Sequence, residues 1–165
     1  MPQRFLRFRT WRPVALAVAS VAVGLLARAD EGPEIQTELV AEVRENVSTT
    51  PGREVYRFVP ARVLAQGQVI YYTLRVTNPA PTFAPNVVVI QRVPANTVYV
   101  PGSASGPGVI VTLSIDGGQT FVSEEELERE GGGRAAAKYT HIRWQLRNPL
   151  APGASALMRF QAVFQ

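Results

Sequence analysis

VIYYTLRVTN, residues 69–78, is the stretch of sequence that decides the fold. Apolar or aromatic side chains at Ile70, Tyr72, Leu74 and Val76 alternate with Tyr71, Thr73, Arg75 and Thr77. A period of two is typical of a strand with one buried face, because successive side chains point to opposite sides of a sheet. The stretch is also rich in β-branched and aromatic residues, which suit a pleated sheet. We therefore predict a strand here, with the first set of side chains facing the core.

Short segments of the same character lie on either side of this strand. Proline, glycine and asparagine separate them, as expected between strands. The predicted strands span residues 35–43, 54–59, 86–93, 97–100, 109–115, 119–122, 139–146 and 156–164. The sequence contains no long amphipathic helix to cross over a parallel sheet. This pattern predicts an all-β chain that folds as an antiparallel two-sheet sandwich.

Two stretches between these strands have more specific patterns. Asp116-Gly117-Gly118 separates two apolar segments, and Asp-Gly is a strong hairpin signal because glycine tolerates the positive φ of such turns. Residues 123–130, SEEELERE, begin with a serine that can cap a helix, and Glu126 follows three residues later, as in a capping box. We expect a hairpin at Asp116 and one short helix or capped turn near 123–130.

The first 29 residues have the three parts of a secretory signal peptide. Arg4, Arg7, Arg9 and Arg12 form a positive segment, residues 14–27 are apolar, and Ala27 and Ala29 are the small residues that a signal peptidase requires. The apolar run is shorter than the ~20 residues that span a bilayer. We therefore expect cleavage before Asp30 and a single domain over residues 30–165. The protein is expected in the periplasm or outside the cell, without membrane attachment after cleavage.

The charge of the chain depends on this N-terminal segment. The sequence has 17 Lys and Arg residues against 13 Asp and Glu residues, a formal net charge of +4. Five of the arginines and no acidic residue precede residue 30, which leaves 12 basic and 13 acidic residues in the remainder. That remainder lacks the positive excess that binds a phosphate backbone, so we expect no nucleic acid partner. The chain has no cysteine, so disulfides do not stabilise it.

The sequence offers little chemistry for catalysis. His141 is the only histidine, whereas metal sites and catalytic triads need several such partners. The carboxylates of residues 124–130 surround a short helix rather than converge on a cation. We therefore expect no catalytic residue, no metal and no cofactor, and a protein that is not an enzyme. A small periplasmic hydrolase stays open as an alternative, because paired carboxylates for glycoside hydrolysis cannot be recognised from sequence alone.

Aromatic and cationic side chains supply the candidate interaction residues. Trp144 and Tyr72 fall on the inward faces of their strands, so we expect Trp144 in the core against Tyr72 and the valines at 87 and 89, rather than in a sugar-binding platform. The outward positions give the candidate surface residues Tyr71, Arg75, Tyr99, His141 and Arg143.

Several blocks of this sequence resemble a known bacterial family. They are LAQGQVIYYTLRVTN at 64–78, the valine strand from Asn86 to Val93-Pro94, YVPGSA at 99–104, Trp144-Gln145-Leu146, and LAPGASA at 150–156. In this order they resemble the "domain of unknown function 11", and the resemblance covers residues 61–165. It implies an immunoglobulin-like sandwich of the kind found on bacterial surface proteins as a spacer or interaction module, with no catalytic activity. Gln91 lies near the place where the family has an acidic residue, and the chain holds a single copy.

These observations predict an exported, non-enzymatic immunoglobulin-like module with a structural role or a protein or envelope polymer as its partner. The alternative is an assembly or adhesin subunit that exchanges strands. Residues 156–164 form an apolar alternating strand at the end of the sequence, which suits pairing with the sheet edge of a neighbour.

Overall fold

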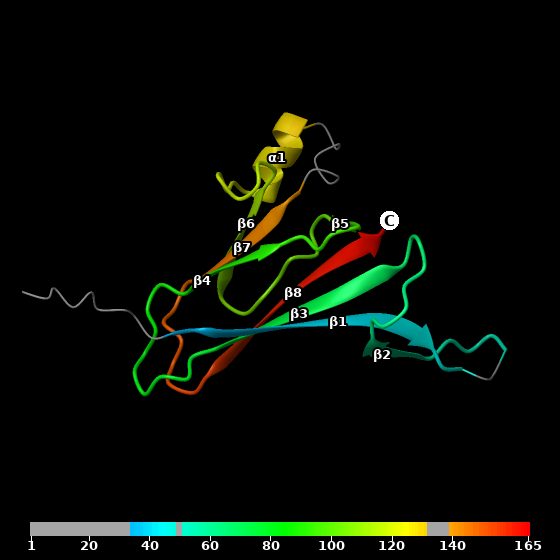
Figure 1. The fold of residues 1–165 in the computed structure, drawn as a ribbon, viewed down its shortest axis with the longest axis horizontal. Helices are drawn as coiled ribbons and strands as arrows, with labels where there is room; N and C mark the ends of the chain where they lie inside the picture. Colours follow the sequence, from blue (N-terminus) through cyan, green and yellow to red (C-terminus); the bar gives the residue numbers. More distant parts are fainter. Residues whose placement is uncertain (1–33, 49–50, 132–138) are drawn as a thin grey trace, which may run out of the picture. The chain divides into compact units, whose positions relative to one another are not determined.

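The computed structural model describes residues 34–48, 51–131 and 139–165 of the 165-residue chain. The predicted signal peptide, residues 1–29, lies outside the described residues. In sequence order the elements are β1 (Gln36–Asn46), β2 (Tyr56–Pro60), β3 (Val69–Thr77), β4 (Val88–Arg92), β5 (Thr97–Tyr99), β6 (Val109–Ser114), α1 (Glu124–Gly131), β7 (His141–Leu146) and β8 (Ser155–Phe164). Figure 1 shows their arrangement.

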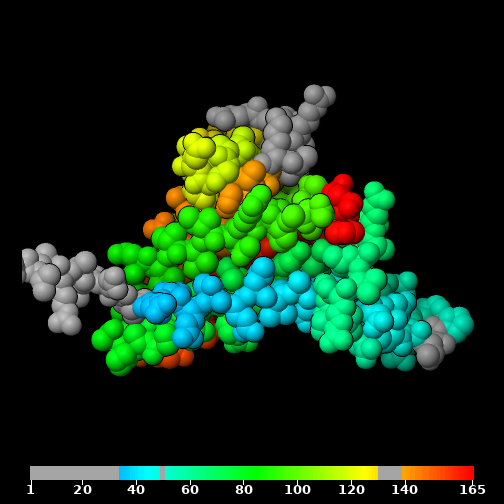
Figure 2. Space-filling view, viewed as in Figure 1, coloured from blue at the N-terminus to red at the C-terminus, as the bar shows by residue number. Residues whose placement is uncertain are grey.

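The strands form two antiparallel sheets, which confirms the predicted all-β sandwich (Figure 1). One sheet has five strands in the order β2-β1-β3-β8-β5, and the other has three in the order β4-β7-β6. The stretch from Val69 to Thr77 is β3, which lies at the centre of the larger sheet. Figure 2, viewed from the same side, shows β1 in blue and cyan exposed along the surface.

The C-terminal strand lies inside the larger sheet rather than at its edge. Residues Val69 to Thr77 of β3 pair with Val163 to Ser155 of β8 along one side. On the other side β8 pairs with β5 and, further along, Arg159 pairs with Ser105. Pairing of β8 with a neighbouring molecule would therefore require it to leave one of these partners.

The core lies between the inner faces of the two sheets. Ile70, Tyr72, Leu74, Val76, Val87, Val89, Val93, Trp144, Met158, Phe160 and Ala162 are buried, as their alternation predicts. Trp144 is 0% exposed, and its register partner across the smaller sheet is Val89. Its ring centroid lies 6.0 Å from that of Phe160, which stacks on Tyr72 at 4.6 Å. These three aromatic rings connect the two sheets.

The predicted hairpin at Asp116 is only partly formed. β6 ends at Ser114, and residues 119–122 are not a strand, because only Val122 pairs back, with Leu113. The chain instead curls around the Asp116 carboxylate, which accepts hydrogen bonds from the hydroxyls of Ser114 and Thr120 and from the Thr120 amide. Hydrogen bonds from the Thr120 and Ser114 hydroxyls hold the pKa of Asp116 well below its usual range.

The predicted short helix is present as α1. The hydroxyl of Ser123 accepts a hydrogen bond from the Glu126 amide at 3.2 Å, which is the expected N-terminal cap. Glu124, in the first turn, accepts a hydrogen bond from the Gly102 amide at 2.8 Å. Burial raises the pKa of Glu124. The helix is thereby connected to the segment that follows β5.

Candidate binding groove

A groove of about 330 Å³ crosses the outer face of the five-stranded sheet. The alternation that sends Tyr72 into the core sends Tyr71 and Thr73 of β3 to this face. Arg159 and Gln161 of β8 and Glu42 of β1 lie beside them. The register places Glu42, Tyr71 and Gln161 in one row across the sheet, and Thr73 and Arg159 in the next. These two rows form the floor of the groove.

One wall of the groove is the segment that follows β5. Gly102 has a φ of 72°, which lets the chain reverse direction there. The Ser103 hydroxyl then accepts a hydrogen bond from the Gln161 amide at 3.0 Å. Ser105 and Arg159 exchange two backbone hydrogen bonds of 2.9 Å. The segment is therefore fixed along β8, with Ser103 and Ser105 lining the groove.

The opposite wall is aromatic. The ring of Phe58, from β2, meets the ring of Tyr71 edge to face, with 4.9 Å between centroids. Because β1 lies between β2 and β3, this contact reaches across a whole strand. Phe58 is 54% exposed. A large apolar side chain is thus held at the groove with much of its surface open to water.

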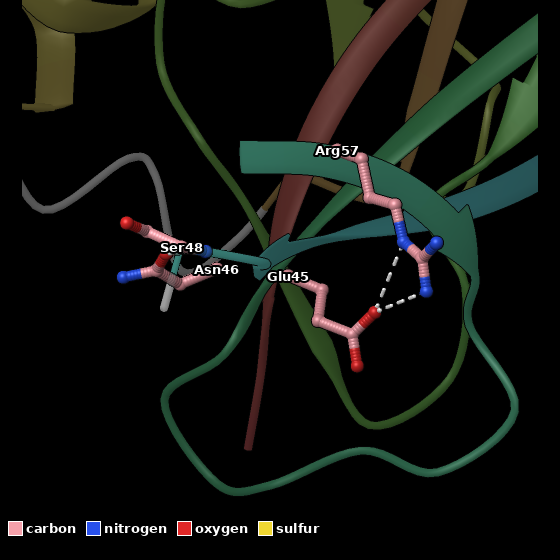
Figure 3. A network of polar contacts seen from close by, with 4 residues as sticks. All are labelled: Glu45, Asn46, Ser48 and Arg57. Carbon is pink, nitrogen blue, oxygen red and sulfur yellow. Dashed lines mark hydrogen bonds and ion pairs between the residues drawn. The ribbon is translucent and has the colours of Figure 1, made fainter. Parts of the chain in front are cut away.

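Polar contacts on the β1–β2 hairpin keep this wall in place (Figure 3). Arg57 donates hydrogen bonds from Nε and Nη2 to Glu45 Oε2, at 3.3 and 3.2 Å. The Ser48 amide donates to Asn46 Oδ1 at 2.9 Å where the chain leaves β1. The Arg44 guanidinium lies 4.2 Å from the centroid of the Tyr56 ring. These exposed contacts are individually weak. The antiparallel pairing of β2 with β1, which places Phe58 opposite Arg44, sets the direction of Phe58.

The polar side chains of the groove floor are not used within the domain. Over residues 34–48, 51–131 and 139–165, the side chains of Glu42, Thr73, Arg159 and Gln161 make no hydrogen bond or ion pair with another described residue. By contrast, Arg75 on the same face of the sheet lies 3.8 Å from Glu38. The groove therefore keeps its donors and acceptors available for a ligand.

The five predicted surface residues do not form one site. Tyr71 lines the groove, and Arg75 lies on the same face of β3. His141 and Arg143 belong to β7 of the other sheet. There the Arg143 guanidinium donates to Thr112 Oγ1 at 2.9 Å and lies over the Phe121 ring. The structure thus divides these residues between the two sheets.

The prediction for Tyr99 is wrong. This side chain is 1% exposed, its hydroxyl accepts a hydrogen bond from the Ala104 amide, and its ring meets Tyr139 edge to face at 5.3 Å. Burial raises the pKa of Tyr99. Tyr99 pairs with Ala162, whose side chain faces the core. A strand of three residues is too short for its alternation to show which face is buried.

His141 borders a second, shallower hollow at one end of the sandwich. The hollow is about 530 Å³ and is lined by backbone and side chains around Arg92, Asn96 and Thr140. His141 Nδ1 lies 3.1 Å from Thr140 Oγ1. Among the described residues that line this hollow, the one aromatic side chain is that of Tyr139, which is buried, so they offer a ligand less apolar surface than the groove does.

Sequence reasoning missed most of the groove. Alternation predicts that three of its residues face outward on their strands, namely Glu42, Arg159 and Gln161, but nothing in the sequence places them beside one another. The position of Phe58 was not predictable, because its segment does not indicate which strand it pairs with. Ser103 and Ser105 lie in a loop, where no alternation exists.

The described part of the chain contains no group of three or more His, Cys, Asp or Glu side chains placed to hold a metal ion. No helix in this part of the chain is both long enough and apolar enough to cross a membrane.

No family model, curated protein or solved structure matches this chain. The resemblance to the domain of unknown function 11 therefore stays a prediction.

Proposed function

We propose that the protein is an exported, non-enzymatic binding module that holds a protein or an envelope polymer in the groove of its five-stranded sheet. The observation that carries this proposal is the groove itself. It combines the exposed aromatic pair Phe58 and Tyr71 with polar side chains that have no partner among the described residues. Ligand sites typically combine apolar surface with a few convergent polar groups.

The position of the groove supports a binding role. Its floor is the outer face of β3 and β8, whose inner faces form the core. Both strands are hydrogen-bonded on both sides, so the side chains on the floor are held at fixed spacings. A site that is already ordered loses less conformational entropy when a ligand binds.

The groove geometry favours binding over hydrolysis. Glycoside hydrolysis ordinarily uses two carboxyl groups on either side of the scissile bond. Among the described residues that line the groove, Glu42 is the one carboxylate. The small periplasmic hydrolase therefore has no observation in its favour.

Cosedimentation with isolated cell envelopes of the source organism tests the binding role. The wild-type protein is expected in the pellet. Phe58→Ala is expected to weaken the association by about tenfold, or ~1.4 kcal/mol, as is usual when a central aromatic contact is truncated. Ile90→Ala is the matched control, because Ile90 is 51% exposed on the other sheet. No association of the wild-type protein, or equal loss in both variants, would refute the proposal.

Export is tested separately by mass spectrometry of the protein from the cell envelope and the medium. The N-terminus is expected to be Asp30, because Ala27 and Ala29 satisfy the signal peptidase. An intact Met1 would contradict a cleaved signal peptide.

A further inference from the structure

We infer that the groove binds an anionic saccharide, a chain of sugar rings that carries a carboxylate. This inference rests on the proposed function, since it names the ligand of the same groove. Three features of the groove support it: the exposed aromatic wall, the two rows of hydrogen-bonding groups, and one cation without a partner.

The aromatic wall suits the apolar face of a sugar ring. Phe58 is more than half exposed, and Tyr71 supports it from the side at 4.9 Å. Tyr71 combines an apolar ring with a hydroxyl that makes no hydrogen bond to another described residue. Such a side chain can pack on a ring and hydrogen-bond one of its hydroxyls at the same time.

The two rows of the floor suit sugar hydroxyls. Each sugar hydroxyl both donates and accepts, so its site needs both kinds of group. Glu42 only accepts, Arg159 only donates, and Tyr71, Thr73 and Gln161 do both. The rows cross neighbouring strands, which lie ~4.8 Å apart, so successive groups face successive parts of an extended ligand.

A peptide fits this surface less well. Extended peptides commonly bind by adding a strand to a free sheet edge. The groove lies on the face of β3 and β8, whose edges are already paired with neighbouring strands. The groove therefore offers side chains rather than free backbone groups.

The charge of Arg159 points to a carboxylate on the ligand. Arg159 is the one cation among the described residues that line the groove, and it has no acidic partner among the described residues. A guanidinium binds a carboxylate through two parallel hydrogen bonds. We therefore place the carboxylate of the ligand beside Arg159 and Ser105, and a sugar ring against Phe58.

Isothermal titration calorimetry with uronic acid oligosaccharides tests this arrangement. The probes are galacturonate and hyaluronan oligosaccharides of four to six sugars, and the same oligosaccharides after methyl esterification, which removes the charge but keeps the rings. We expect the acid forms to bind about tenfold more tightly than the esters, a difference of ~1.4 kcal/mol. This preference should weaken with added salt.

Variants assign the contacts. Arg159→Gln should abolish the preference for the acid form, while Arg159→Lys should keep part of it, because lysine retains the charge but not the paired geometry. Phe58→Ala should weaken the binding of acid and ester alike. Arg75→Gln is the control, since Arg75 lies on the same face but does not line the groove. Thermal unfolding of each variant shows whether its fold is intact.

Three outcomes overturn the inference: equal binding of acid and ester, an unchanged preference in both Arg159 variants, or no binding of any oligosaccharide. If one of these outcomes is found but the protein still sediments with envelopes in a Phe58-dependent manner, the inference of an anionic saccharide fails and the groove remains a binding site for a protein or another envelope polymer. If sedimentation is absent as well, the proposed function fails with it.

Discussion

Tyr71 and Tyr72 are adjacent in the chain but lie on opposite faces of the five-stranded sheet. Tyr72 is buried and stacks on Phe160 at 4.6 Å, and burial raises its pKa. Tyr71 lines the groove and meets Phe58 edge to face. The same type of residue thus contributes to a surface site at position 71 and to the core at position 72. The two faces of the sheet differ because the second sheet covers only the inner one.

The inner face and the outer face are expected to respond differently to substitution. Inner-face side chains fill the space between the sheets, so their loss affects the free energy of unfolding. Outer-face side chains in the groove make few contacts within the domain, so their loss affects ligand binding. The following predictions test this difference, from the largest effect to the smallest.

Trp144→Ala is expected to destabilise the domain most. Emptying a buried aromatic site typically costs ~3–5 kcal/mol, and Trp144 is fully buried between the sheets. We expect a value near ~3 kcal/mol, because the buried Nε1 has no hydrogen-bond partner among the described residues and its removal relieves that cost. Chemical denaturation measures the change. A loss below ~1 kcal/mol would mean that Trp144 does not join the two sheets.

Substitution of the two tyrosines compares the faces directly. Tyr72→Ala is expected to cost ~2 kcal/mol, less than Trp144→Ala, since it removes a smaller core ring that is 7% exposed. Tyr71→Ala is expected to cost less than ~1 kcal/mol, as for most surface positions, but to weaken binding to envelopes. Urea denaturation and cosedimentation of both variants measure the two effects. Equal destabilisation by the two substitutions would contradict the difference between the faces.

The buried tyrosines predict a loss of stability at alkaline pH. Burial raises the pKa of Tyr72 and Tyr99, and burial together with nearby Glu124 raises that of Tyr139 to about 12. The folded protein therefore holds these protons more tightly than the unfolded chain, where a tyrosine titrates near pH ~10. Their contribution to stability is complete below pH ~10 and is lost as the pH rises toward 12.

Urea midpoints at pH 9 and pH 11 measure this alkaline effect. Tyr72→Phe is the control, because it keeps the ring and removes one ionisable group. Its urea midpoint should therefore fall less between pH 9 and pH 11 than that of the wild-type protein. A wild-type midpoint that is the same at both values would contradict the burial of these hydroxyls.

Arg75→Gln is expected to have the smallest effect. Its ion pair with Glu38 spans 3.8 Å, and both side chains are more than half exposed. Exposed pairs contribute ~0–1 kcal/mol, so the change in unfolding free energy should stay below ~0.5 kcal/mol. Denaturation in low and high salt checks this. A loss above ~1 kcal/mol would show that the outer face also supports the fold.

The sequence by itself determined the faces of the longer strands. The period-two patterns of β3, β7 and β8 identified their buried residues, Trp144 of β7 among them, because alternation is a local property of each strand. Ser123 was recognisable as the cap of α1 for the same local reason. Short elements were harder to predict. Tyr99 lies in a strand of only three residues. At Asp116 the predicted tight hairpin is a wider turn, because the Asp116 side chain accepts hydrogen bonds from Thr120.

Only the tertiary structure decided the groove. Phe58 meets Tyr71 because β1 separates β2 from β3 by one strand, and Ser105 reaches Arg159 because the segment after β5 follows the edge of β8. Strand order depends on how the whole chain buries its apolar surface, so the periodic pattern of a single segment does not predict it. The pattern of each strand shows which side chains face water, but the order of the strands decides which of them lie together.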